Sequence, residues 1–393
     1  MKICLALEKF SKHAGGAESY AVDLAGSLIS KGWEAHLVGY EWDGQPESAI
    51  FHKLDRPPVW FPSSLKLLHF AHNHRRLVER ENFDVVVGFG STLLMNVYQS
   101  HGGVHSLSSK RKLQAIRNPA ARFVKGILML ATPKYHVRSW IESAAFRLSP
   151  MPKIVAISDM IKQDMTDTFG VPEDRIQVIY NGIDGSRFSR NPDQIKMLNL
   201  RKSLGFDDHV LFLFMSYDFR KKGLRFLIEA AGKLRQITNA KFGLVVVGRP
   251  PSPSLLRLVR RLGLNGVVAF PGSTKSPQDF YNACDVFALP TFYDACSLVV
   301  FEAMSCGLPV ITTAYNGASG IIDHGIDGFV MKDPSNTTDL CNSMKKLLDH
   351  GVRSQMGDKA FIKSRKYSLE ANHESMTRVF MEAAQERKMA PIQ

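Results

Sequence analysis

Two acidic residues, Asp294 and Glu302, lie eight positions apart in the sequence LPTFYDACSLVVFEAMSCGLPVITT. A strand is expected to end at Pro290, and a helix then begins near Ser297 and Leu298. Free backbone N–H groups at a helix start can hold a phosphate, and a carboxylate on the second turn can accept hydrogen bonds from two ribose hydroxyls. The spacing therefore predicts a nucleotide site that includes Ser297, Leu298 and Glu302.

Glu302 has almost only apolar neighbours along the chain, namely Val299, Val300, Phe301, Ala303 and Met304. A carboxylate among such side chains must be paired with hydrogen-bond donors. An ordinary exposed acid on a helix surface is therefore a poor alternative, and we expect Glu302 to have a binding role.

A basic turn, RKKG at 220–223, stands between a predicted strand and a predicted helix. Ligands of open α/β sheets bind at the carboxyl edge of the strands, where this turn opens. Adjacent cations at that edge, Lys221 and Lys222, can neutralise a leaving diphosphate without a metal ion. A solvated surface turn has the same composition and remains an alternative.

Paired glycines, Gly15 and Gly16, stand where the first strand passes into the first helix. Such a turn lets backbone N–H groups approach an anion closely, and the helix dipole adds attraction. A plain tight turn of an α/β layer has the same pattern. A GxGxxG sequence is absent here, which argues against a nicotinamide cofactor.

The elements around these residues alternate between apolar strands and amphipathic helices, the pattern of βαβ units with a parallel sheet. The first half is expected to contain strands at 3–7, 35–39, 84–89, 97–100, 153–158 and 176–180, with helices at 17–31, 65–81 and 160–169. The second half repeats the pattern with strands at 210–216, 243–247, 267–270, 286–290, 310–312 and 328–331, and with helices at 224–234, 254–262, 277–283, 298–305, 338–348 and 369–385.

A chain of 393 residues with this alternation predicts two Rossmann-like, doubly wound α/β domains. We expect an N-terminal domain at 1–180, a polar linker at 181–199 and a C-terminal domain at 200–370. A final helix at 371–393 is expected to pack back toward the N-terminal domain.

The formal net charge of +13 implies an anionic partner. Between residues 107 and 147 nine Lys or Arg residues face one acid, Glu142, and they alternate with large apolar side chains. This mixture predicts a segment that docks on an anionic membrane surface. A solvated basic face is the alternative, whereas nucleic acid is not expected, because no reading motif accompanies the charge.

The five cysteines are scattered and show neither disulfide nor zinc spacing, which favours a reducing compartment. The apolar stretch at the N-terminus is too short for a signal peptide or an anchor. We therefore expect a cytoplasmic protein, attached peripherally to the inner face of the membrane.

The motifs together resemble the GT-B-fold retaining glycosyltransferases of family four, in which two domains face each other across a cleft. The similarity extends over nearly the whole chain: GGAE at 15–18, VAISDMIKQDM at 155–165, VIYNGID at 178–184, RKKG at 220–223 and the acid-x7-Glu motif. SYDFRKKGL and the basic segment after His105 are most similar to bacterial UDP-glucose:(heptosyl)lipopolysaccharide α-1,3-glucosyltransferases.

The resemblance implies that the N-terminal domain binds the acceptor and the C-terminal domain the nucleotide sugar. Gly15 and Gly16 would lie near the donor phosphates, Lys221 and Lys222 would contact the diphosphate, and Glu302 would bind the ribose.

The same resemblance assigns the remaining site residues. Asp294 would contact the transferred sugar, although the family usually has the longer Glu there, which alters the expected reach. His101, in YQSHGGVH, would hydrogen-bond the donor sugar near the reacting carbon, with His105 as its rival. Relatives often carry an acid at the position of Gly320, which has no assigned role.

No Asp-x-Asp pair occurs in the sequence, so metal-independent transfer is expected. The resemblance implies retention, through front-face departure of the nucleotide. UDP-glucose is the expected co-substrate, and a glycan or lipid-linked molecule is the expected acceptor. The alternatives are UDP-N-acetylglucosamine, GDP-mannose or ADP- or GDP-heptose as donor, a sugar-nucleotide epimerase, or a non-catalytic protein that binds nucleotide sugars or membranes.

Overall fold

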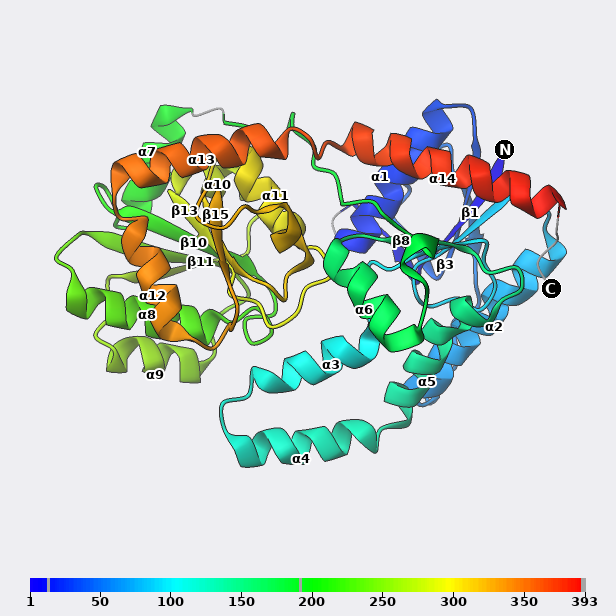
Figure 1. The fold of residues 1–393 in the computed structure, drawn as a ribbon, viewed down its shortest axis with the longest axis horizontal. Helices are drawn as coiled ribbons and strands as arrows, with labels where there is room; N and C mark the ends of the chain where they lie inside the picture. The colour runs from blue at the N-terminus through cyan, green and yellow to red at the C-terminus, as the bar shows by residue number, and fades with distance from the viewer. Residues whose placement is uncertain (13–14, 191–192, 390–393) are drawn as a thin grey trace. The chain divides into compact units, whose positions relative to one another are not determined.

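The computed structural model describes residues 1–12, 15–190 and 193–389. The chain forms two compact units, one of Met1–Tyr180 with Glu370–Gln393 and one of Asn181–Leu369 (Figure 1). Residues 390–393 of the expected C-terminal helix lie outside the described residues.

The first unit is built on a parallel seven-stranded sheet. Its strand order is β5-β3-β1-β6-β7-β8-β9. The bounds are β1 (Lys2–Ala6), β3 (Glu34–Gly39), β5 (Ile50–Lys53), β6 (Val85–Gly88), β7 (Val97–Gln99), β8 (Lys153–Ala156) and β9 (Ile176–Val178). Most residues of the central strands are buried, as expected for a parallel sheet covered on both faces. Helix α2 (Ser63–Arg80) follows β5 and helix α6 (Asp159–Phe169) follows β8, whereas the short strand β2 (Lys9–Phe10) separates β1 from helix α1 (Gly16–Ser30).

The basic segment folds as three helices that the sequence analysis did not define, α3 (His105–Gln114), α4 (Pro119–Leu130) and α5 (Pro133–Glu142). Two of them begin with proline, whose fixed backbone angle suits the first helical position. The Asn118 side chain caps α4 by accepting the Ala121 N–H at 3.0 Å. No residue of α4 is buried.

The last helix, α14 (Leu369–Met389), belongs to the core of the first unit. Met376, Val379 and Phe380 are buried in one apolar cluster with Ile3 and Leu5 of β1. The first sheet therefore acquires part of its core from the far end of the chain (Figure 1).

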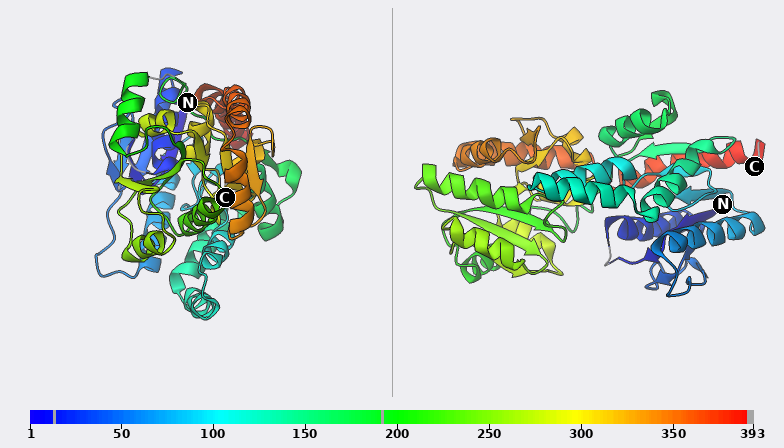
Figure 2. Two further views of the ribbon diagram at one scale, coloured as in Figure 1. Left: turned by 90° about the vertical axis from the view of Figure 1, so that its left-hand side faces the viewer. Right: turned by 90° about the horizontal axis from the view of Figure 1, so that it is seen from below.

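The second unit contains a parallel six-stranded sheet with the order β12-β11-β10-β13-β14-β15. Its strands are β10 (Val210–Ser216), β11 (Phe242–Gly248), β12 (Val268–Gly272), β13 (Val286–Ala288), β14 (Val310–Thr313) and β15 (Gly328–Met331). Helices lie on both faces of this sheet (Figure 2). They are α7 (Gln194–Ser203), α8 (Leu224–Ile237), α9 (Pro253–Arg261), α10 (Pro277–Ala283), α11 (Leu298–Ser305), α12 (Thr337–Lys346) and α13 (His350–Ser364).

Helix α7 occupies part of the segment expected to be a linker, which corrects that expectation. Asp193 caps it by accepting the Lys196 N–H at 3.1 Å, and two of its apolar residues, Ile195 and Leu198, are exposed. The helix thus lacks the buried apolar face by which a helix is usually recognised in a sequence.

Candidate active site

The basic turn is held against the end of β13 by a glycine. Gly223 has φ +76°, and a Cβ atom there would lie 2.0 Å from the Pro290 carbonyl oxygen, so no other residue fits without displacement. The next contact is a hydrogen bond of 2.9 Å from the Phe292 N–H to the Lys221 carbonyl. These contacts place Lys221 and Lys222 beside the segment that carries Asp294.

Lys222, Asp294 and Ser297 form one polar cluster. The Lys222 ammonium pairs with Asp294 Oδ2, the Ser297 hydroxyl donates to the same carboxylate, and Lys222 Nζ lies 3.4 Å from Ser297 Oγ. The Lys222 and Asp294 side chains are only 15% and 18% exposed. The motifs predicted that these residues belong to one site, but they did not predict that the side chains pair with each other. A phosphate that binds Lys222 must therefore compete with Asp294.

The loop before α11 is fastened by Asn316, which is fully buried. Its carboxamide oxygen accepts the N–H groups of Ser297 and Ala318, each at 3.2 Å, and its nitrogen donates to Thr312 Oγ1 at 3.0 Å. The Ser297 N–H is thus committed to the protein. The Val300 N–H donates to the Ser297 carbonyl at 3.1 Å. The N–H groups of Leu298 and Val299, at the very start of α11, have no acceptor within the helix. Sequence reasoning missed Asn316, although the Asn-Gly pair at 316–317 was a turn signal.

Glu302 has the partner that its apolar neighbours required. The Tyr281 hydroxyl, on α10, donates to Glu302 Oε2 at 2.6 Å. Burial raises the pKa of Glu302, and this hydrogen bond opposes the shift. Burial and the nearby carboxylate hold the pKa of Tyr281 well above its usual value, so Tyr281 remains a donor. The predicted contact with the ribose would therefore be made by the other carboxylate oxygen, Glu302 Oε1.

Lys221 is the second lysine of the turn that could contact a phosphate, and like Lys222 it is partly buried. Burial lowers its pKa, and the Asp218 carboxylate opposes that shift. Its backbone N–H is bound to Asp218 Oδ1 at 3.0 Å, which fixes the start of the turn.

His101 lies in the turn after β7, at the carboxyl edge of the first sheet. Its ring centroid is 4.5 Å from that of Tyr20 and 5.4 Å from that of Phe89. Burial lowers the pKa of His101 to about 3, so the ring is neutral at pH 7. Its Nε2 is buried and has no hydrogen-bond partner within the described part of the chain. A neutral imidazole nitrogen can donate or accept a hydrogen bond, so this atom can serve a ligand.

Tyr20 is itself held in place by hydrogen bonds. Its hydroxyl accepts from Gln99 Nε2 at 3.1 Å and donates to Asn372 Oδ1, on α14, at 3.0 Å. The surface beneath His101 is therefore fixed by both ends of the chain.

His105 is in a different environment. It is the first residue of α3, and its backbone N–H donates to both carboxylate oxygens of Glu142, at 3.0 and 3.1 Å. Burial, and then the positive charge of Arg138, lowers the pKa of His105 to about 4. Its ring lies 5.3 Å from that of Tyr135, within the basic segment.

Gly15 and Gly16 occupy the start of α1, where the sequence placed them. A Cβ atom on Gly15 would lie 2.5 Å from Glu18 Oε2, because the Glu18 carboxylate folds over the helix start. Sequence reasoning gave Glu18 no role. An anion that approaches these N–H groups therefore meets a negative charge unless Glu18 moves.

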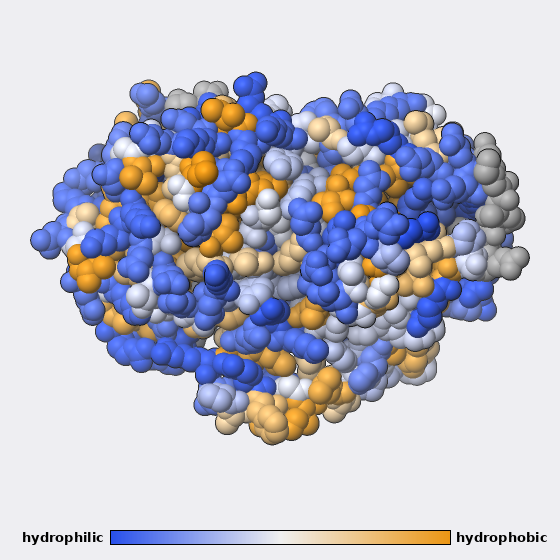
Figure 3. Space-filling view, viewed as in Figure 1, coloured by the Kyte–Doolittle hydropathy of each residue, from blue (hydrophilic) through white to orange (hydrophobic). Residues whose placement is uncertain are grey.

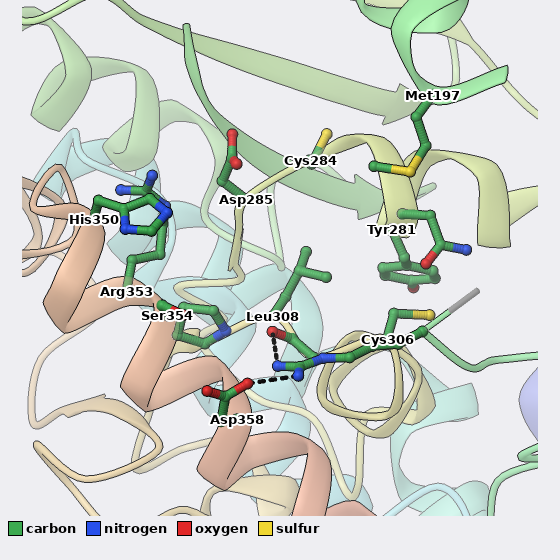
Figure 4. Close-up of a pocket in the computed structure, with 14 residues that line it drawn as sticks. Met197, Tyr281, Cys284, Asp285, Cys306, Leu308, His350, Arg353, Ser354 and Asp358 are labelled. Atoms are coloured by element: carbon green, nitrogen blue, oxygen red, sulfur yellow. Dashed lines mark hydrogen bonds and ion pairs between the residues drawn. The ribbon is translucent and has the colours of Figure 1, made fainter. Parts of the chain in front are cut away.

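A pocket of about 380 Å³ lies at the opposite, amino edge of the second sheet (Figure 4). Arg190 and Asp358 pair across it at 2.5 Å, and Asp285 and His350 also line it. None of the residues assigned from the motifs lines this pocket. Among the described residues, those of this pocket included, no group of three His, Cys, Asp or Glu side chains is placed to hold a metal ion.

Comparison with known families identifies the two parts of the chain. Residues 14–187 match Glycosyltransferase Family 4, and residues 208–350 match Glycosyl transferases group 1. The chain belongs to these glycosyltransferases. This assignment covers both Rossmann-like units and the residues of the Lys222 cluster.

Curated relatives of this glycosyltransferase include lipopolysaccharide glucosyltransferase WaaG of Escherichia coli strain K12, 23% identical over 339 residues, which are 85% of this chain and 86% of WaaG. An uncharacterised glycosyltransferase of Methanocaldococcus jannaschii is 30% identical over 213 residues. The latter match spans about half of each protein, 53% of this chain and 54% of the relative.

Solved structures show the same GT-B fold. WaaG has a TM-score of 0.78 at 21% identity, with 96% of this glycosyltransferase and 99% of WaaG aligned. Anabaena HepE, solved with UDP and glucose, has a TM-score of 0.72 at 19% identity, with coverage of 97% and 100%.

Proposed function

We propose that this glycosyltransferase moves a sugar, with retention, from a nucleotide-sugar donor to a glycan or lipid-linked acceptor in the synthesis of lipopolysaccharide core or another cell-surface polysaccharide. UDP-glucose is the proposed donor. The observation that carries the proposal is the Lys222–Asp294–Ser297 cluster at the start of α11, with Glu302 on the next turn of the same helix.

Each group has a task in this scheme. Lys222 and the N–H groups at the start of α11 take up the charge that develops on the departing diphosphate, and such fixed donors act without reorganisation. Asp294 is released from Lys222 as the phosphate binds and turns to the transferred sugar. Glu302, oriented by Tyr281, holds the ribose. His101 offers its Nε2 to the sugar. Cationic side chains and helix N–H groups serve in place of a metal ion.

The choice of donor draws on the relatives. WaaG is named a lipopolysaccharide glucosyltransferase, and HepE was solved with UDP and glucose. Calorimetric titration with UDP-glucose, UDP-N-acetylglucosamine, GDP-mannose and ADP-heptose tests the donor. Tightest binding of a guanine or adenine nucleotide sugar would overturn the UDP assignment.

Incubation with donor alone and with donor plus acceptor separates transfer from the rival activities. Transfer requires both substrates, an epimerase converts the donor by itself, and a non-catalytic binder does neither. NMR of the product reports its anomeric configuration, and inversion would contradict the retaining mechanism.

We also propose that residues 107–147 dock the protein on an anionic membrane surface, at the inner face of the cytoplasmic membrane. Phe123 and Leu128, on α4, are 69% and 60% exposed, and Val124 and Ile127 are exposed on the same helix. Figure 3 shows a hydrophobic patch over α4 at the lower edge of the view. Among the described helices, none is long and apolar enough to cross a bilayer.

Cations near an anionic leaflet contribute about 1 kcal/mol each, so several together hold a protein reversibly. Neutralising Lys110, Arg111, Lys112, Arg117 and Arg122 should therefore abolish sedimentation with anionic vesicles at low salt. Neutralising Arg257, Arg260 and Arg261 of α9 removes basic charge from another exposed helix, and this control variant should still sediment with the vesicles. Equal binding by both variants, or equal binding to neutral vesicles, would refute the docking proposal.

A further inference from the structure

A second pocket, of about 570 Å³, opens at the carboxyl edge of the first sheet. It is lined by the segments that follow β1, β3 and β5, by the start of α2 and by Lys134 of α5. Ligands of open α/β sheets bind at this edge, and small-molecule sites commonly have volumes of about 300–1,000 Å³. The pocket is thus large enough for a sugar and its substituents.

Four cations line this pocket, against two carboxylates, Glu8 and Glu41. They are Lys9, Arg56, Lys66 and Lys134. Glu41 is shared, because Lys9 approaches it to 3.2 Å and Arg56 pairs with its other oxygen. The lining therefore carries two positive charges more than negative ones. A phosphate monoester carries roughly −1.5 to −2 at pH 7, which matches this surplus better than the single charge of a carboxylate.

Tyr40 supplies an independent sign of a ligand. Its hydroxyl oxygen is buried and has no hydrogen-bond partner in the described part of the chain. The ring is held edge-on to Phe70 at 5.3 Å. Burial raises the pKa of Tyr40 to about 12, so the group is a neutral donor at pH 7. A buried donor without an acceptor costs free energy, which a ligand oxygen would recover.

Lys66 is already oriented for such a ligand. Its Nζ donates to the Val59 carbonyl at 2.9 Å, which fixes the ammonium and leaves its other N–H groups for a further acceptor. Val59 and Leu67 add an apolar wall, the kind of surface that packs against the C–H face of a sugar ring. A site for a free anion alone would not need this wall.

We propose that this pocket binds a phosphorylated sugar through Lys66, Lys134 and the Tyr40 hydroxyl. The assignment rests on the proposed transferase function and makes the acceptor a phosphate-bearing saccharide. Lys134 belongs to the basic segment 107–147, so the same segment would contribute both to membrane docking and to acceptor binding.

Calorimetric or NMR titration of the full chain with glucose 6-phosphate, glucose, glucuronate and inorganic phosphate tests the proposal. Glucose 6-phosphate should bind at least tenfold more tightly than each of the others. The double variant Lys66→Gln/Lys134→Gln should weaken the binding of glucose 6-phosphate at least tenfold, and Tyr40→Phe should weaken it less. Lys345→Gln, an exposed lysine of α12, is the matched control and should have no effect.

UDP titration of the same variants keeps this proposal separate from the proposed function. UDP affinity should stay at the wild-type value in the pocket variants. Binding of glucose 6-phosphate that the Lys66/Lys134 variant does not change, or inorganic phosphate binding as tightly as glucose 6-phosphate, would overturn the pocket assignment. If UDP binding were intact in the same experiment, the transferase proposal would still stand. If the wild-type protein failed to bind UDP, the transferase proposal itself would be rejected.

Discussion

Glu142 is predicted to make the stability of the first unit fall as pH rises. It is the last residue of α5, is only 6% exposed, and accepts the His105 N–H that begins α3. Burial raises its pKa to about 7, against the opposing effects of that N–H and of Arg138. Replacement by Gln keeps an acceptor for the N–H and removes the titration.

The sign follows from proton linkage. Between its unfolded pKa of 4.5 and its folded pKa of about 7, Glu142 ionises in the unfolded chain while it stays protonated in the folded one. The folded state then binds more protons, so the free energy of unfolding decreases with rising pH. At 1.36 kcal/mol per pKa unit, the wild type should lose about 2.5 kcal/mol relative to Glu142→Gln between pH 5 and pH 8.

Urea unfolding at several pH values, followed by tryptophan fluorescence, measures this difference. All four tryptophans, Trp33, Trp42, Trp60 and Trp140, lie in the first unit, so the signal reports on that unit alone. Glu79→Gln, at an exposed acid of α2, is the control and should show no comparable pH dependence. If the free energies of unfolding of the wild type and of Glu142→Gln differed by the same amount at pH 5 and at pH 8, the reasoning would be refuted.

The remaining predictions concern the second unit. Glu302→Ala should abolish transfer and weaken UDP binding at least tenfold. Tyr281→Phe should weaken UDP binding less, because it removes only the hydrogen bond that orients the carboxylate, worth about 1.5–3 kcal/mol. Unchanged UDP affinity in folded Glu302→Ala protein would contradict the ribose role. Lys222→Ala should lower kcat more than it weakens the binding of uridine, and Lys221→Ala should have a milder effect. If either variant lost affinity for uridine and for UDP equally, that lysine would not bind phosphate. Asp294→Asn should raise UDP affinity while turnover falls, since it removes the carboxylate that competes for Lys222; lower UDP affinity would count against that competition. Activity should survive EDTA, and its loss with recovery on adding a divalent ion would contradict metal-independent transfer.

The sequence was most informative where strands are buried on both faces. The strand expected at 210–216 coincides with β10 (Val210–Ser216), and the helix expected at 298–305 coincides with α11. Such strands are continuous apolar runs, which a single sequence displays clearly. The edge strand β5 was missed, because Ile50–Lys53 is short and half polar.

Other features depended on signals that were not used or on contacts distant in the sequence. Pro119 and Pro133, with Asn118 as a cap, marked the starts of α4 and α5. The pairing of Lys222 with Asp294, and of Tyr281 with Glu302, arises only when neighbouring strands bring their loops together. Motif spacing therefore singled out the candidate site residues, whereas the partners of their side chains depended on the fold.

Helix α14 also sets the order in which the chain can mature on the ribosome. Residues 1–180 leave the exit tunnel first, but the side chains of Met376, Val379 and Phe380 that close their core are made only after the whole second unit. Until then the nascent first sheet exposes apolar surface, a condition that favours aggregation and chaperone binding. A chain that stops before Leu369 would retain every strand of its first sheet and still lack a closed core.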